Sequence, residues 1–445
     1  MIKSYFKLAI KVLKRKKFFT FISLFGISFT LMILMLITSF LSNELGQYAP
    51  MTDKDKMVFL DWVSMRLMVP DTILKIDSTL VDGAMQFDTT RTYDKRQTSM
   101  SRSSYSFALL DNHLRSVQGV KQSTFYASGF AYNIFKNGQK IKLESIQTDA
   151  NYWDVFDFHF LEGSPYTKQD VNNQAQYAII SDKAARVYFG TTNNLLGQEI
   201  VVEKKHYKVV GVIKQPTTNH SAVQADLYMP YTNMPSYLFD DPTEFLGPFQ
   251  AVFVANNESS KKIIRDDLER ISEQFVMPKP EEYNELDIED LTFNEQYADI
   301  LLYQDTPQES LSLAKWILFF LLGLFILLPT LNLININISR ILERSSEIGV
   351  RKSFGADSLQ LLLQFVFENV ILTFIGGLIG LLLAFLAIYW INDSQVLQNT
   401  NLEINFKVFL YSVLICLGFG ILSGIIPAYR MSKLPIAQSL KQNSI

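Results

Sequence analysis

A short charged stretch between two long apolar runs is the first candidate for chemistry in this sequence. It reads ERSSEIGVRKSFGADS, residues 343–358. Glu347 and Arg351 are spaced i,i+4 in the order that favours an ion pair along a helix. Gly355 can end that helix, and Asp357 or Ser358 can cap the next one. The pattern predicts a short, rigid helix that offers a surface to a partner.

Residue patterns for catalysis and for binding of metals or nucleotides are missing from the sequence. It contains no GxxxxGK[ST] phosphate cradle for ATP. The histidines have neither HExxH nor another paired metal spacing, which favours ordinary surface or core roles for all of them: His113, His159, His206 and His220. We therefore expect this chain to be no enzyme and to carry no catalytic residue, no metal and no cofactor.

Four apolar windows are long enough to cross a bilayer, whose hydrocarbon core takes about 20 helical residues. The first follows a basic start, as in a signal peptide, but its apolar run exceeds the about 7 to 15 residues of such a peptide, so we expect an anchor. The expected segments are an amphipathic basic helix at 1–17, transmembrane helices at 18–42, 365–390 and 406–428, an external domain at 43–306, a stalk with its transmembrane helix at 307–338, a coupling segment at 339–364, an external loop at 391–405 and a tail at 429–445.

Lysine and arginine near the membrane ends predict the orientation. Residues 1–17 are basic without any acidic residue, and 339–358 and 429–445 hold further basic residues, so both termini are expected in the cytoplasm. Residues 1–17 have helical apolar spacing and either lie on the inner leaflet or only mark the inside. The external domain keeps an excess of acidic residues. The sole cysteine, Cys416, lies in the fourth window, so no intrachain disulfide is expected.

The external domain combines helical and strand-like patterns. Two α/β units, at about 104–135 and 247–300, are separated by a β-rich stretch at about 136–245, and Thr- and Ser-rich residues at 88–104 indicate an exposed hairpin or loop. The fold class expected is therefore an α+β membrane protein. It has four transmembrane helices and a large external α/β domain of two subdomains, one inserted in the other, between helices 1 and 2.

Two sets of residues are expected to organise the membrane helices. Thr306, Pro307 and Glu309 combine a capping box with proline at the first helical position, which predicts the start of a helical stalk. Small residues allow close approach of helix backbones in lipid. The candidates on the third and fourth helices are Gly376, Gly377, Gly380, Gly420 and Gly424. The alternative is that glycine is simply common in membrane helices.

The charged stretch resembles the signature of the MacB/FtsX-like permease family of ABC transporters, ER-x-x-EIG-[IV]-R-K-A-x-GA followed by a glutamine, a glutamate and GG-x-x-G. Ser353 and Phe354 depart from the commoner small and aliphatic residues. The ending PAYRMSKLPIAQSLK and the external segment TDANYWDVFDFHFLEGSPYTKQD are also similar to this family. The matching residues are Glu343, Arg344, Glu347, Ile348, Gly349, Val350, Arg351, Lys352, Gly355, Ala356, Gln364, Glu368, Gly376, Gly377 and Gly380.

The resemblance implies a permease subunit in a bacterial inner membrane, paired with itself or with a related permease. Its coupling helix, with Ile348, Val350 and Phe354 as apolar contacts, would be gripped by a separate ABC ATPase that binds ATP and Mg²⁺. Relatives export drugs or peptides with a periplasmic adaptor and an outer-membrane protein, extract lipoproteins, or activate cell-wall hydrolases. Membrane lipid is an expected partner and nucleic acid is not. The alternatives to transport are a mechanotransmitting sensor or hydrolase activator, and a structural scaffold.

Overall fold

The protein is described by a computed structural model that covers residues 17–81, 84–136, 138–239, 241–304, 306–343, 358–394 and 396, and part of 402–421. It divides into two compact units. One consists of Gln47–Leu311, and the other of Met1–Gly46 together with Ser312–Ile445. Each unit is described below by itself.

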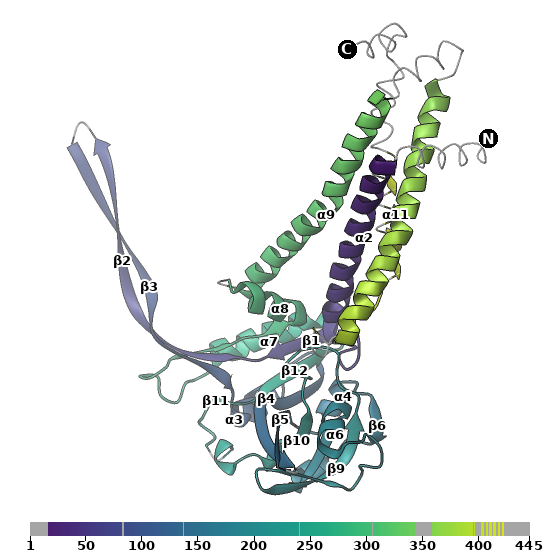
Figure 1. Ribbon diagram of the computed structural model, residues 1–445. Coiled ribbons are helices and arrows are strands. Elements are labelled where there is room, and N and C mark those ends of the chain that lie inside the picture. The colour runs from purple at the N-terminus through teal and green to yellow at the C-terminus, as the bar shows by residue number, and fades with distance from the viewer. Residues whose placement is uncertain are drawn as a thin grey trace. The chain divides into compact units, whose positions relative to one another are not determined.

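A ten-stranded mixed sheet forms the frame of unit Gln47–Leu311 (Figure 1). Its order is β14-β1-β12-β4-β5-β10-β7-β9-β6, with β8 paired to β9. Strands β1, β7, β10 and β12 are buried at almost every position, as expected for the part of a sheet that is covered on both faces. The bounds are β1 Met57–Leu60, β4 Val120–Lys136, β5 Gln139–Thr148, β6 Phe160–Gly163, β7 Tyr177–Ser181, β8 Glu199–Val202, β9 Lys205–Ile213, β10 Leu227–Pro230, β12 Gln250–Ala255 and β14 Leu291–Thr292.

The predicted layout of two subdomains is not confirmed, because this sheet joins strands of both. The predicted boundary near residue 136 falls inside the β4–β5 hairpin, where Lys136 pairs with Gln139. Strand β5 then pairs in parallel with β10, from Leu227↔Ser145 onward. Hydrogen bonding therefore continues from the first α/β unit into the β-rich stretch without a break.

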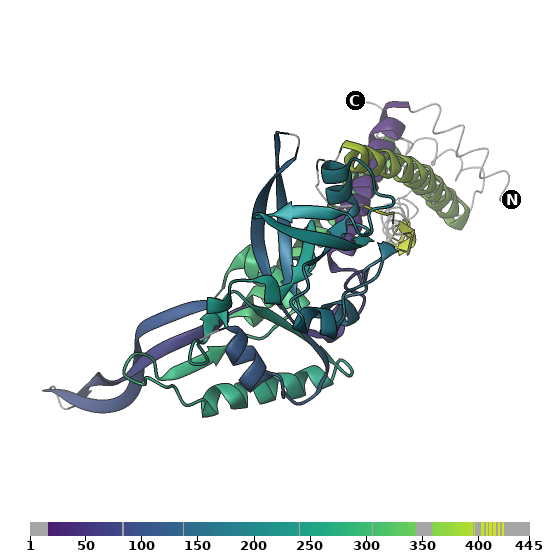
Figure 2. The same ribbon diagram turned by 90° about the horizontal axis from the view of Figure 1, so that it is seen from below.

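A second, four-stranded sheet has the order β11-β3-β2-β13 and contains a long hairpin. Strands β2 (Val63–Val81) and β3 (Ala84–Tyr105) pair along their whole length, up to Val81↔Ala84. Strand β13 (Glu285–Ile288) reaches only to Arg66, and β11 (Leu246–Gly247) pairs only with Ser104 and Tyr105. In the described part of the chain, the hairpin beyond Leu67 is thus a two-stranded ribbon, which projects from the sheet in Figures 1 and 2. The Thr- and Ser-rich stretch at 88–104 lies in its second strand.

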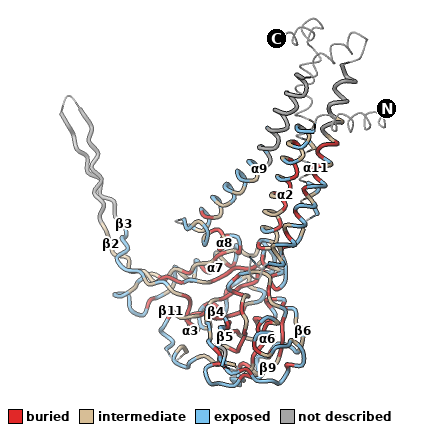
Figure 3. Tube along the Cα trace, viewed as in Figure 1, coloured by how far each residue is buried: buried red, intermediate tan, exposed pale blue. Residues whose placement is uncertain are grey.

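Three clusters of buried side chains make up the core of this unit (Figure 3). In one of them, aromatic rings surround Tyr152: Phe156 packs edge to face with a centroid distance of 4.8 Å, and Phe158 stacks at 5.6 Å. The helices have these bounds: η1 Lys54–Lys56, α3 Phe107–Leu109, η2 Leu110–Leu114, α4 Tyr152–Val155, α5 Lys168–Asn172, α6 Asp182–Phe189, η3 Tyr231–Asn233, η4 Ser236–Leu238, α7 Ser260–Gln274 and α8 Phe293–Leu302.

Three long apolar helices characterise the other unit: α2 (Lys17–Leu45), α9 (Pro307–Glu343, which begins in the first unit) and α11 (Ser358–Ser394). The stretches long and apolar enough to cross a membrane are Thr20–Leu45, Pro307–Phe325 and Val370–Ser394. Four spans are not confirmed, since the fourth window is described only in part. At 37 residues, α9 measures about 55 Å at about 1.5 Å per residue, well beyond a hydrocarbon core of about 30 Å.

Candidate functional site

The candidate site is the stalk base, which we define as α8, the first turn of α9 and the side chains that hold them on the sheet. Helix α8 ends at Tyr303, whose backbone is left-handed with φ 43° and ψ 68°. Helix α9 begins at Pro307, and Thr306 Oγ1 accepts a hydrogen bond from the Glu309 N–H at 3.3 Å. The two helices are thus joined by an elbow of a few residues.

A capping box fixes the start of α8. The carboxylate of Glu295 accepts from the Thr292 N–H at 2.8 Å, and the Glu295 N–H donates to Thr292 Oγ1 at 3.4 Å. This arrangement satisfies two backbone donors that the helix itself leaves free. It also places the Glu295 side chain, which is only 6% exposed, at the junction of α8 with β14.

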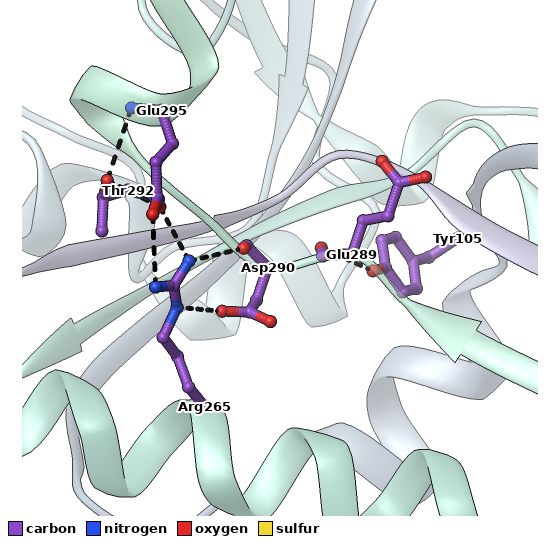
Figure 4. A network of polar contacts seen from close by, with 6 residues as sticks. All are labelled: Tyr105, Arg265, Glu289, Asp290, Thr292 and Glu295. Carbon is purple, nitrogen blue, oxygen red and sulfur yellow. Dashed lines mark hydrogen bonds and ion pairs between the residues drawn. The ribbon is translucent and has the colours of Figure 1, made fainter. Parts of the chain in front are cut away.

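Arg265 from α7 binds this carboxylate and a second one, as Figure 4 shows. Its Nη2 lies 2.7 Å and its Nη1 3.3 Å from the two oxygens of Glu295. Its Nε donates to the carboxylate of Asp290, and Nη2 also donates to the Asp290 carbonyl at 3.0 Å. The planar guanidinium therefore ties α7, the β13–β14 connection and α8 together.

The charges in this cluster are only partly compensated. Burial works against the charge of Arg265, but Asp290 and Glu295 outweigh it and raise its pKa above the usual value. Burial also raises the pKa of Asp290, although Arg265 acts in the opposite direction. Removing the guanidinium would therefore leave two carboxylates in a partly desolvated place.

A second link runs through Gln296, the next residue of α8. Its Nε2 donates to the Asp61 carboxylate between β1 and β2, and its Oε1 accepts from Nε2 of His220. His220 Nδ1 accepts from the Ala222 N–H at 3.2 Å, so the imidazole is neutral and protonated on Nε2. His220 and Gln296 are buried and Asp61 is half-buried where the three side chains meet, and these contacts fix α8 against two loops at once.

Burial has the largest effect on the pKa values of Asp61 and His220. It raises the pKa of Asp61 to about 6, with the hydrogen bond from Gln296 acting the other way. It lowers the pKa of His220 to about 4, and the hydrogen bond to Gln296 opposes that shift while Lys54 adds to it. Both groups thus favour their neutral forms.

Polar contacts continue from the stalk base to the root of the β2–β3 hairpin. Arg102 pairs with Glu289 at 2.6 Å, and the buried Tyr105 hydroxyl donates to the carbonyl of Trp62 at 2.8 Å. An open cavity of about 690 Å³ is lined by residues of the hairpin and of the stalk base, among them Arg66, Lys95, Arg265 and Gln308. Its three cations are paired with Asp287, Glu285 and Asp290, which also line it. The cavity wall includes the first turn of α9.

The glycines predicted on the third membrane helix lie against α2. A Cβ atom on Gly376 would be 2.7 Å from Ile27 Cγ2, and one on Gly380 would be 2.9 Å from the Ser28 carbonyl oxygen. Gly377 is less crowded, with Val413 Cγ2 at 3.5 Å. Ile27 and Leu31 are buried where they meet α11. Two of these glycines therefore occupy places where a larger residue does not fit.

The other predicted site residues lie outside the described residues. These are the coupling residues Arg344, Glu347, Ile348, Gly349, Val350, Arg351, Lys352, Phe354 and Gly355, and the helix-packing residues Gly420 and Gly424. Glu343 is the last residue of α9. The basic helix at 1–17 is described only at Lys17. No group of His, Cys, Asp or Glu in the described ranges is arranged to hold a metal ion.

Sequence reasoning missed Arg265, Gln296 and Asp61 and interpreted His220 as ordinary. One signal was available, because Thr292-Phe293-Asn294-Glu295 has the spacing of a capping box. The others had none, since Gln296 meets partners 235 and 76 residues away in the chain.

Comparison with known proteins gives a consistent set of matches. The model of the MacB-like periplasmic core domain matches residues 20–271, and that of the FtsX-like permease C-terminal domain matches residues 319–436.

Named relatives match over most of the chain. The pyoverdine export ATP-binding/permease protein PvdT of Pseudomonas syringae pv. syringae B728a is 27% identical over 65% of this chain and 41% of its own length, so the chain spans less than half of that relative. The uncharacterized ABC transporter permease YknZ of Bacillus subtilis is 24% identical over 74% of this chain and 77% of its own. The solved extracellular domain of YknZ from Gram-positive bacteria is 19% identical, with a TM-score of 0.31 over 40% of this chain and 86% of that domain.

Proposed function

We propose a function from one premise: this chain belongs to the family of FtsX-like ABC transporter permeases with a MacB-like periplasmic core domain. In this proposal it is the membrane subunit of a transporter in a bacterial inner membrane. A separate ATPase subunit binds ATP and Mg²⁺, and its hydrolysis moves the periplasmic domain, which exports or extracts a substrate outside the membrane. Both chain termini lie in the cytoplasm.

The observation that carries the proposal is the continuity of α9. One helix of 37 residues starts at the stalk base and ends at Glu343, within the predicted coupling segment 339–364. A continuous helix transmits displacement along its axis, because backbone hydrogen bonds link its successive turns. Pro329, which has no N–H, removes one of these bonds from α9. A push on the coupling segment would therefore arrive at the elbow below α8.

The stalk base provides the next step of the transmission. Helix α8 is held by Arg265 through Glu295 and by Asp61 and His220 through Gln296. These partners come from α7, from the β1–β2 connection and from the loop after β9, so a movement of α8 reaches several elements of the sheet. Charge-assisted and buried hydrogen bonds suit this role, since their geometry is fixed.

The partners follow from the same premise. Permeases of this family work with an ABC ATPase, and the relative PvdT is named as an ATP-binding/permease protein. We propose that the ATPase grips Glu343 to Gly355, with Ile348, Val350 and Phe354 as apolar contacts. The permease pairs with itself or with a related permease, and Gly376, Gly377, Gly380, Gly420 and Gly424 pack its membrane helices. A periplasmic adaptor, an outer-membrane protein or a lipoprotein are candidate external partners.

A second candidate function is favoured by the same α9 observation, because a stalk can transmit force without passing a substrate. In that case the chain is a mechanotransmitting activator of a cell-wall hydrolase. The two functions differ in what copurifies with the complex, a substrate or adaptor in one case and a hydrolase in the other.

The decisive experiment isolates the complex from cells and changes one link at a time. Glu347→Ala with Arg351→Ala should leave membrane insertion intact and sharply lower ATPase association or its stimulation. Two glycines inserted after Ser312 should leave ATPase association intact but abolish the external activity, because glycine costs a helix about 1 kcal/mol per site. Unchanged activity with both variants would refute transmission through α9.

A further inference from the structure

The elbow between α8 and α9 is closed by a side chain rather than by backbone hydrogen bonds alone. Tyr303, in its left-handed conformation, donates its N–H to the Asp299 carbonyl at 2.9 Å and so ends α8. The next N–H of such a helix end often returns to a carbonyl of the last turn. Here the Gln304 N–H donates instead to Ser310 Oγ, in the first turn of α9, at 3.1 Å.

The same hydroxyl makes a second bond. Ser310 Oγ donates to Asp299 Oδ1 on α8 at 3.1 Å. Ser310 is 0% exposed, although Gln308, Glu309 and Ser312 around it are exposed. One buried hydroxyl therefore connects the last turn of α8, the elbow and the first turn of α9.

Among the described residues, few other contacts hold the elbow. Its large apolar side chains point into solvent: Ile300 is 76%, Leu301 75% and Tyr303 78% exposed. Of the described residues from Leu301 to Ser310, Ser310 alone is fully buried. Helix α8 itself is secured separately, through Glu295 and Gln296 at its other end.

From this geometry we propose that Ser310 and Asp299 are positioning residues that form a latch. While the hydroxyl bridges Gln304 and Asp299, α9 keeps a fixed direction relative to α8. When the bridge breaks, the elbow bends at Tyr303 while α8 stays on the sheet, because its own anchors do not involve the latch. The relevance of the latch for force transmission rests on the proposed function, but its existence does not.

The test uses the full chain in lipid nanodiscs, with Cys416→Ser as background. Nitroxide labels on Asn294→Cys in α8 and Lys315→Cys in α9, both exposed positions, report the elbow angle through their distance distribution by pulsed electron resonance. Ser310→Ala should broaden that distribution and speed hydrogen exchange of the Gln304 amide by about tenfold, the effect of losing one hydrogen bond. Ser310→Thr keeps the hydroxyl and should restore both readouts.

Ser312→Ala is the matched control, two residues further along the same helix and exposed. Asp299→Ala should broaden the distribution as well, and it is the second variant in case Ser310→Ala does not fold. The latch would be overturned if Ser310→Ala and Asp299→Ala both kept a narrow distance distribution and slow hydrogen exchange of the Gln304 amide, as Ser312→Ala should. Because neither readout involves an ATPase, a failure of the proposed function would leave this result unchanged.

Discussion

Arg265 on α7 holds Glu295 on α8 with two guanidinium nitrogens, at 2.7 and 3.3 Å. The pair lies where the chain leaves the sheet for the stalk, only twelve residues before Pro307. Glu295 is also the residue that closes the capping box of α8. One ion pair thus serves both the local stability of a helix and the attachment of the stalk to the sheet.

Arg265→Ala should destabilise the external unit by about 2 kcal/mol, because it leaves the carboxylates of Asp290 and Glu295 without their cation. This loss is smaller than that expected for a fully buried ion pair, since the Arg265 side chain is 28% exposed. Thermal unfolding of the full chain should shift down by about 4 to 8 °C. Lys262→Ala, an exposed position on the same helix, is the control and should change little. Equal shifts in the two variants would show that the pair contributes nothing.

Asp61 should give the unfolding free energy an unusual pH dependence. Its pKa of about 6 in the folded protein is above the ordinary aspartate value of 3.8, so the folded state binds this proton more tightly than the unfolded chain. The contribution of Asp61 therefore stabilises the protein at pH 4 and is lost as the pH rises through about 6. The total is up to about 3 kcal/mol, at about 1.4 kcal/mol per pKa unit.

The measurement compares wild type with Asp61→Asn in chemical denaturation between pH 4 and 7. Relative to the variant, the wild type should gain stability as the pH falls. His220 has the opposite sign, because its pKa of about 4 means that stability is lost as the pH falls from about 6.5; it is present in both proteins and cancels in the difference. Asp154→Asn replaces an exposed carboxyl outside the Asp61–Gln296–His220 contacts, and its unfolding free energy should show the same pH dependence as the wild type. Parallel curves for wild type and Asp61→Asn would contradict the assignment.

Parts of this architecture could be predicted from the sequence, because they depend on residues that are close to one another in the sequence. Hydropathy located the long apolar helices, and the signals at Thr306 and Pro307 predicted a helix that does begin at Pro307. The predicted layout of two subdomains is not confirmed, and the reason lies in contacts between distant parts of the chain. The strand-like composition of β4 and β5 was visible in the sequence. The pairing of β5 with β10, about 80 residues later, which extends one sheet, was not. The Asp61–Gln296–His220 contacts also arise only once the sheet has formed.

Gly380 should be intolerant of a larger side chain. A Cβ there would be 2.9 Å from the Ser28 carbonyl oxygen and 3.0 Å from Leu31 Cβ, both of which belong to α2. Gly380→Leu must therefore push α2 and α11 apart, and we expect markedly lower yield and thermal stability of the protein in detergent. Gly323→Ala on α9, where a Cβ meets nothing within 4 Å, is the matched control and should be neutral or slightly stabilising. Normal stability of Gly380→Leu would mean that this helix contact is not needed.

The outer part of the β2–β3 hairpin should be dispensable for folding. Among the side chains of the two strands that the structure describes, the buried ones end at Ser64 and Ser104, near the root, and β11 and β13 pair only there. Val69 and Arg96 are register partners, so replacing Pro70–Lys95 by Asn-Gly joins them with a two-residue turn that suits the twist of a hairpin. The only described ion pairs removed are the exposed ones of Lys95 with Glu285 and of Arg96 with Asp71, each contributing no more than about 1 kcal/mol.

Thermal unfolding of the shortened chain should stay within a few degrees of the wild type. Loss of external activity in a chain that remains this stable would then locate a contact surface on the ribbon, whereas a large drop in unfolding temperature would show that the ribbon packs against the rest of the molecule.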